Sequence, residues 1–232
     1  RAAGRRHRAH VPRAGLGGGG TFVLVHGAAD TAASWDEVAA ALRGRGHQVV
    51  AVDLPCEDDS AGLEEYADTV VAAIGADRDD LVVVGHSLGG YTATMVADRL
   101  PTRMLVLVTA MVPRAGETPM EFWANTGHRF GTDDIVQTYL PDATPEQAER
   151  ALALGREQSG TPMSEPFPLE RWPDVPTRYL ACTRDNFNPV AWTREMVRDR
   201  LGLEADEIDA GHCPYITRPD ELAQRLHGYA SA

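Results

Sequence analysis

The sequence contains no lysine, so arginine supplies all 22 of its lysine-plus-arginine residues. This absence excludes chemistry that needs a lysine amine, such as Schiff-base formation. Cysteine is scarce as well: Cys56, Cys182 and Cys213 are widely spaced and form no Cys-x-x-Cys pair. Such spacing argues against a disulfide framework or a structural zinc site and is typical of a reducing compartment, so we expect a cytoplasmic protein.

The sequence also lacks long apolar runs, and after residue 13 it has no excess of basic residues. No stretch of about 18 apolar residues occurs, so we expect no transmembrane helix and no membrane partner. The net charge is −12, and residues 1–13 hold five arginines without an acid, which leaves 17 arginines against 34 acidic residues in the remainder. A body of this charge should repel nucleic acid and anionic membranes, so a small molecule is the expected partner.

The length and the local composition predict one folded domain. The 232 residues are 43% hydrophobic and 24% charged, which is ordinary for a globular protein. Residues 1–20 are basic and then glycine-rich, without apolar periodicity, and we expect them to form a disordered arm. We expect residues 21–232 to form the domain, as a monomer or a homodimer.

Short apolar runs alternate with segments of helical pattern along this domain. Strands are predicted at 21–26, 48–53, 81–84, 104–108, 177–182 and 204–208. Helices are predicted at 34–43, 63–74, 91–100, 191–201 and 219–229, the first with Ser34 as N-cap and Glu37 completing a capping box. The pattern predicts an α/β fold, with a mostly parallel twisted sheet of about six strands and helices on both faces.

The alternation stops between residues 113 and 172. Helical pieces fit 120–128, 133–139 and 145–157, and no strand pattern occurs, so we expect a helical cap insertion over the carboxyl edge of the sheet. Its apolar residues could face a substrate or could simply attach the cap to the body. The candidates are Met111, Met120, Phe122, Trp123, Phe130 and Met163. The four that we expect to bind substrate are Met111, Phe122, Trp123 and Phe130.

The pattern Gly-x-Ser-x-Gly, centred on Ser87, follows the apolar run 81–84 and precedes the helical stretch 91–97. This order of strand, tight turn and helix predicts a nucleophilic serine at the top of the turn. Gly85 and Gly89 leave room where a Cβ would strike a neighbouring strand or helix. The alternative is a glycine- and serine-rich turn without chemistry.

A serine hydroxyl needs a base and an acid that orients the base. Asp185 and His212 each follow a predicted strand, so parallel strands would bring them to the same edge as Ser87, in the chain order Ser, Asp, His. His212 would take the proton of Ser87, and Asp185 would fix the tautomer of the ring. The expected donors to an oxyanion are the backbone amides of Leu88 and Ala28.

Other polar residues of these loops have structural explanations. We expect His26 and His86 to bond the backbone around the turns, and Asp53 and Asp209 to shape their loops. Cys213 is expected to be an apolar filler, with a redox-sensitive thiol as the alternative. Two remote alternatives for the acid are Glu165 and Asp174.

These motifs resemble the α/β-hydrolase superfamily, and the closest likeness is to the small branch that contains plant methylesterases and hydroxynitrile lyases. The segments that carry the likeness are 22–28, 52–55, 85–90 and 211–212. The resemblance implies the fold and the serine triad. The hydroxynitrile lyases use a lysine directly after the catalytic histidine, whereas Cys213 stands here. Haloalkane dehalogenases and epoxide hydrolases place an aspartate at the position of Ser87. All three activities are therefore disfavoured.

The sequence thus predicts a serine hydrolase, without a cofactor or a metal, that cleaves a small to medium, largely apolar carboxylic ester through an acyl-enzyme on Ser87. A thioesterase or lactonase, a C–C bond hydrolase and a cofactor-free perhydrolase would use the same triad. A ligand receptor that kept the fold without catalysis is the alternative from another class.

Overall fold

The computed structural model describes residues 20–75 and 78–231, so the expected arm lies outside the described residues except for Gly20. The described chain folds around one six-stranded sheet in the order β2-β1-β3-β4-β5-β6. All five strand pairings are parallel. The strands are β1 Thr21–Val25, β2 Gln48–Val52, β3 Leu81–His86, β4 Thr102–Val108, β5 Thr177–Cys182 and β6 Asp206–Ile208. The predicted fold class is confirmed.

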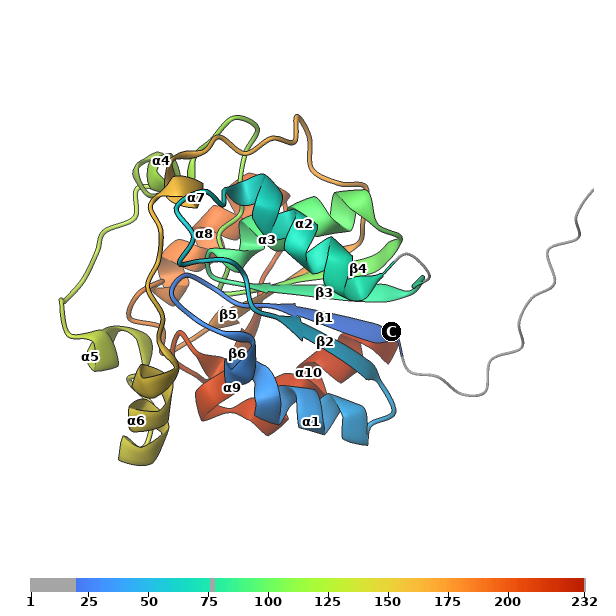
Figure 1. The fold of residues 1–232 in the computed structure, drawn as a ribbon. Coiled ribbons are helices and arrows are strands. Elements are labelled where there is room, and N and C mark those ends of the chain that lie inside the picture. Colours follow the sequence, from blue (N-terminus) through green and yellow to red (C-terminus); the bar gives the residue numbers. More distant parts are fainter. Residues whose placement is uncertain (1–19, 76–77, 232) are drawn as a thin grey trace, which may run out of the picture.

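Helices cover both faces of the sheet (Figure 1). Those that flank it are α1 Asp36–Gly44, α2 Leu63–Ile74, α3 Gly89–Arg99, α8 Val190–Leu201, α9 Pro214–Thr217 and α10 Pro219–Ser231. Four further helices lie between β4 and β5: α4 Pro119–Asn125, α5 Ile135–Tyr139, α6 Pro145–Leu154 and α7 Thr161–Ser164. No helix in the described part of the chain is long and apolar enough to cross a membrane.

Side chains of the strands alternate between two apolar layers. In β1, Val23 and Val25 pack in a cluster with α2, α3 and α8. Phe22 and Leu24 point the other way, into a cluster with α1 and α10. Because successive side chains of a strand face opposite sides, a strand that is covered on both faces reads as a continuous apolar run. This is why the first and third strands could be found from sequence.

The predicted start of the first helix is wrong. A 3₁₀ turn, η1 Ala32–Trp35, comes first, and the N-cap of α1 is Trp35, without a side-chain cap. The hydroxyl of Ser34 instead donates to Asp30 Oδ1. The partly buried Asp30 carboxylate thus accepts a hydrogen bond from the hydroxyl that the capping pattern assigned to the helix.

Capping boxes do fix the starts of two helices between β4 and β5. Thr118 Oγ1 accepts from the amide of Glu121 at 3.1 Å, and Thr144 Oγ1 accepts from the amide of Gln147 at 3.2 Å. A proline occupies the first turn of each helix, where its missing N–H costs nothing. Thr-Pro-x-Glu and Thr-Pro-x-Gln are therefore the sequence signals that begin α4 and α6.

A buried ion pair ties the segment before α4 to α8. The side chains of Arg200 and Glu117 are only 1% and 5% exposed. Arg200 Nη2 donates to Glu117 Oε1 at 2.7 Å, and Arg200 Nη1 donates to the carbonyl of Val112 at 2.7 Å. Burial alone would raise the pKa of Glu117, but hydrogen bonds from Arg200 and Asn125 hold it below its usual value. The guanidinium also lies 4.8 Å from the ring centroid of Phe122.

We predict that Arg200→Met lowers the free energy of unfolding by about 3–5 kcal/mol, because it leaves the Glu117 carboxylate buried without its partner. Arg114→Met is the matched control. Arg114 pairs with Asp199, and these side chains are 54% and 70% exposed. Its loss should cost less than about 1 kcal/mol. Urea unfolding at neutral pH measures both, and equal effects would contradict the prediction.

Candidate active site

Ser87 sits in the turn between β3 and α3 with a φ of +50°, a conformation that side-chain-bearing residues rarely adopt. Hydrogen bonds hold this turn against β4. The amide of Ser87 donates to the carbonyl of Val108 at 3.4 Å, and its own carbonyl accepts from the amides of Gly90 and Met111 at 3.1 and 2.9 Å. The hydroxyl is therefore carried on a fixed backbone at the carboxyl edge of the sheet.

Two glycines make this turn possible, as the motif predicts. A Cβ on Gly85 would lie 2.6 Å from the Cβ of Ala93 in α3. A Cβ on Gly89 would lie 2.5 Å from the carbonyl oxygen of His26, just beyond β1. Both distances are far below van der Waals contact, so only glycine lets the helix follow the strand so closely.

Asp185 and His212 meet in the buried interior. His212 Nδ1 donates to Asp185 Oδ2 at 2.7 Å, and their side chains are 3% and 0% exposed. This bond places the proton of the neutral ring on Nδ1 and leaves the Nε2 lone pair free to accept a proton. The loops after β5 and β6 thus bring together the aspartate and the histidine, as the chain order predicts.

The Asp185 carboxylate is held by three further donors. Oδ1 accepts from the amides of Phe187 and Asn188 at 2.9 and 2.7 Å. Oδ2, which receives the His212 proton, also accepts from the hydroxyl of Thr109 at 2.6 Å. Thr109 follows β4 and has a φ of +38°, and Asn188 Nδ2 donates to its carbonyl at 3.1 Å. Sequence reasoning missed Thr109, because nothing in its local pattern signals a role.

The histidines of the turns bond the backbone, as expected. The amide of Leu54 donates to His26 Nε2 at 3.0 Å, so the proton lies on Nδ1, which donates to the carbonyl of Gly27 at 2.8 Å. His86 Nε2 donates to the carbonyl of His212 at 2.8 Å. Burial lowers the pKa of His86 well below its usual value. A neutral ring therefore supports the loop that carries His212.

The two carboxylates given loop-shaping roles also behave as expected. Asp53 accepts from the Thr31 hydroxyl and the Ala32 amide at 2.6 and 2.8 Å. Asp209 accepts two hydrogen bonds from Arg184, each 2.7 Å long, and so ties the loop after β6 to the loop after β5.

The two alternative acids lie elsewhere. Glu165 accepts from the amide of Leu63 at 2.7 Å, and Asp174 lines a separate hollow.

The amides of Leu88 and Ala28 are available for a ligand. Both residues line the same cavity as Ser87. Neither amide donates to an acceptor within residues 20–75 and 78–231. Leu88 directly precedes α3, where free N–H groups and the helix dipole favour a negative charge. The pair suits an oxyanion that develops beside Ser87.

Within the described residues, no hydrogen bond joins the Ser87 hydroxyl to the ring of His212. Both side chains nevertheless line one cavity. Bonds between a nucleophile and its base are often long in a ligand-free state and shorten when substrate binds. Ser87 and the hydrogen-bonded pair of His212 and Asp185 therefore lie around one cavity, without a hydrogen bond between Ser87 and His212 in the described residues.

This cavity has a volume of about 630 Å³ and lies between the strand ends and helices α4 to α7. Its wall on the sheet side includes Asp30 and Tyr215, whose hydroxyl donates to Asp30 Oδ2 at 2.7 Å. The segment between β4 and β5 contributes most of the apolar wall, and the loop after β5 adds one aromatic ring. The apolar and aromatic side chains that line it are Met111, Trp123, Ile135, Tyr139, Leu140, Leu152, Met163 and Phe187.

Two of the four expected substrate-binding residues do not line this cavity. Phe122 is fully buried and packs against Arg200 and Trp192, so the expectation for Phe122 is corrected. Phe130 is 64% exposed and packs against Trp123, with ring centroids 5.5 Å apart. Met111 and Trp123 do line it.

Aromatic rings from the segment between β4 and β5 and from the β5 loop cover the histidine. The ring centroids of Tyr139 and Phe187 lie 5.4 and 5.1 Å from that of His212. The Asp142 carboxylate accepts from the amide of Gly211 at 3.0 Å and so holds the histidine loop from the same side. Sequence reasoning missed these residues, because Tyr139 lies in a helix too short to show a period and the other two lie in loops.

Cys213 also lines the cavity, beside the histidine. Burial raises the pKa of its thiol, which keeps it protonated. A protonated thiol reacts slowly with oxidants, which favours the filler over the redox sensor.

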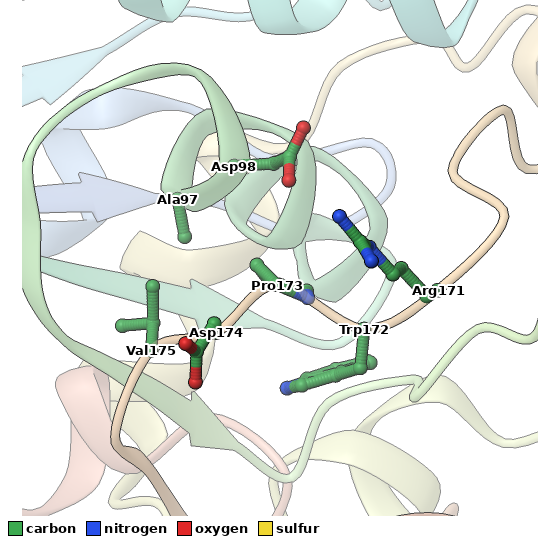
Figure 2. Close-up of a pocket in the computed structure, with 7 residues that line it drawn as sticks. All are labelled: Ala97, Asp98, Arg171, Trp172, Pro173, Asp174 and Val175. Atoms are coloured by element: carbon green, nitrogen blue, oxygen red, sulfur yellow. The ribbon is translucent and has the colours of Figure 1, made fainter.

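A second hollow of about 510 Å³ lies between the end of α3 and the segment before β5. Figure 2 shows Asp98, Arg171 and Asp174 around it, together with Trp172. No serine or histidine is among its lining residues. Elsewhere in the described chain, no group of three or more histidine, cysteine, aspartate and glutamate side chains is arranged to hold a metal ion.

The parallel sheet, the strained serine turn and the chain order of the three polar residues define an α/β-hydrolase. The chain belongs to this family: residues 22–225 match the group described as the alpha/beta hydrolase family.

The similar proteins include a plant methylesterase, which agrees with the branch that the sequence motifs resemble. Methylesterase 7 of Arabidopsis thaliana is 29% identical over 88% of this chain and 94% of its own. A pyrethroid hydrolase of Sphingobium wenxiniae is 26% identical over 91% of this chain and 88% of its own. The crystal structure of polyneuridine aldehyde esterase shares the fold, with a TM-score of 0.77 and 22% identity over 91% of this chain and 99% of its own.

We predict that Thr109→Val slows the labelling of Ser87 by an uncharged alkyl fluorophosphonate by about 10-fold or more, the value of one lost hydrogen bond to a charged group. The variant keeps the branched shape but removes the donor to Asp185. Thr109→Ser restores the hydroxyl and should label within about 2-fold of the wild type. Equal losses in both variants would show that the hydroxyl does not matter.

Proposed function

We propose that the protein is a serine hydrolase that cleaves a carboxylic ester through an acyl-enzyme on Ser87. The observation that carries this proposal is the buried 2.7 Å hydrogen bond from His212 to Asp185, with the His212 ring lining the same cavity as Ser87. In this proposal residues 21–232 form one hydrolase domain, residues 113–172 act as its cap, and the protein works in the cytoplasm.

The first half of the reaction forms the acyl-enzyme. Ser87 Oγ attacks the ester carbonyl while His212 Nε2 takes its proton, and Asp185 stabilises the imidazolium. The amides of Leu88 and Ala28 donate to the oxyanion of the tetrahedral intermediate. His212 then gives its proton to the leaving alkoxide, which departs as the alcohol.

The second half repeats these steps with water. His212 Nε2 takes a proton from the water that attacks the acyl carbon, and the same two amides hold the second oxyanion. Collapse of this intermediate returns the proton to Ser87 Oγ and releases the carboxylic acid. The cycle needs no group beyond the chain and water.

The cavity supports a substrate of small to medium size with a largely apolar body. Its volume of about 630 Å³ is in the usual range for small-molecule sites. Aromatic and aliphatic side chains form the wall opposite the sheet. The names of the relatives, methylesterase and pyrethroid hydrolase, support an ester over the thioester, lactone, C–C bond and perhydrolase reactions that the same triad could serve.

We predict that the protein hydrolyses p-nitrophenyl esters and that Ser87→Ala lowers kcat by about 10³-fold or more, because the nucleophile is lost while the oxyanion donors remain. The matched control is Ser34→Ala. Ser34 is a second serine that lines the cavity, but its hydroxyl is bound to Asp30. It should retain at least about a tenth of the wild-type kcat.

Two results would contradict the proposal. If Ser34→Ala and Ser87→Ala reduced kcat equally, Ser87 would not be the nucleophile. If the wild type turned over no ester while it bound one stoichiometrically, the protein would be a receptor on this fold.

A further inference from the structure

Exposed large apolar side chains are concentrated in one part of the described chain. Five are strongly exposed, and all of them lie between β4 and β5: Met120, Phe130, Ile135, Val136 and Leu152. The rest of the described surface has none of this kind. Scattered exposed apolar residues are normal, but a concentration beside a binding cavity marks an interaction site.

Two of these residues also line the cavity that holds Ser87. Ile135, at the start of α5, is 57% exposed, and Leu152, near the end of α6, is 51% exposed. A residue that lines a cavity and is half exposed stands at its mouth. We call Ile135 and Leu152 the apolar rim.

The apolar rim continues into the cavity without a polar break along α5. Ile135 and Tyr139 are one helical turn apart, so they share a face, and both line the cavity. Tyr139 in turn lies against His212, with ring centroids 5.4 Å apart. An apolar group could therefore lie continuously from the reacting ester bond to the outside of the molecule.

The charges around the rim fit a neutral occupant. The charged group directly before α5 is Asp134, whose carboxylate caps the helix by accepting from the amide of Gln137. Arg156, the arginine in the cavity wall, already donates to Glu57 at 3.1 Å and to the carbonyl of Leu54 at 3.1 Å. Among the described residues that line the cavity, no arginine is therefore left without a partner to bind an anionic group.

We propose that the apolar rim is an extended subsite, and that the substrate is a neutral ester with a long lipophilic arm whose distal part lies across Ile135 and Leu152. This rests on the proposed ester hydrolysis at Ser87. The part of the substrate inside the cavity is small to medium, and the arm leaves through the mouth between α5 and α6. Each methylene that the rim removes from water should raise kcat/KM about 3- to 4-fold.

The test compares p-nitrophenyl esters of 4 and 12 carbons, both kept below their critical micelle concentrations. The variants are Ile135→Gln and Leu152→Gln, which make the rim polar at positions that solvent already reaches. Each should lower the ratio of kcat/KM for the long ester over the short one by about 5-fold or more. The matched control is Met120→Gln, which is 59% exposed on α4 but does not line the cavity. It should leave the ratio and both rates at the wild-type values.

An unchanged ratio in both rim variants overturns the inference. So does an effect that appears only above the critical micelle concentration, because the rim would then bind an aggregate surface. A change of oligomeric state in the rim variants, measured by sedimentation, would assign the rim to contact between two copies and would also overturn it.

The two proposals can fail separately. If the wild type hydrolyses both esters but the rim variants do not change the ratio, only the subsite is wrong. If no ester is hydrolysed, calorimetry with octyl phenyl ether, which cannot be cleaved, still tests the rim. Weaker binding in Ile135→Gln and Leu152→Gln than in Met120→Gln would support it, and equal binding in all three would overturn it.

Discussion

The hydrogen bond between His212 and Asp185 is the contact on which the rest of the site depends. It joins the loops after β5 and β6, and it fixes which nitrogen of the imidazole can accept a proton. An aspartate so deeply buried would be costly without partners, and here four hydrogen bonds satisfy its two oxygens. These donors come from the loops that follow β4, β5 and β6, so the order of the strands positions the aspartate as well as the histidine.

The segment between β4 and β5 lines the cavity and also contacts the histidine of this hydrogen bond. Tyr139 covers the histidine ring, and Asp142 holds its loop through the amide of Gly211. Water is thereby kept from the hydrogen bond between His212 and Asp185, and a low local dielectric strengthens that bond. The buried pair of Arg200 and Glu117 anchors the start of this segment to α8. This ion pair therefore contributes to the stability of the fold and also holds in place a segment that lines the cavity.

The sequence predicted the features that depend on repeating patterns. Apolar runs located the strands, and their parallel order placed Asp185, His212 and Ser87 at one edge. Gly85 and Gly89 predicted the tight turn, because a side chain at either position would clash with a neighbouring strand or helix. The structure brings the three polar residues together, while their catalytic roles remain the proposal that experiments must test.

Sequence patterns could not predict the features of the site that depend on the direction of individual side chains. Phe122 and Trp123 are neighbours in α4, yet Phe122 faces the buried Arg200 and Trp123 faces the cavity. Helices as short as α5, with five residues, have no periodicity from which to choose a face. Thr109 was missed because a threonine after a strand is common, and its contact with Asp185 spans 76 positions of sequence.

The central claim is that an acyl group passes through the oxygen of Ser87. The direct measurement is mass spectrometry of the protein quenched in acid during turnover of a slowly deacylating p-nitrophenyl ester, followed by peptide mapping. The account predicts a mass increase equal to the acyl group on the peptide that contains Ser87, and its disappearance as the ester is consumed. An acyl group on another residue, or continued turnover with no adduct at any time, would contradict it.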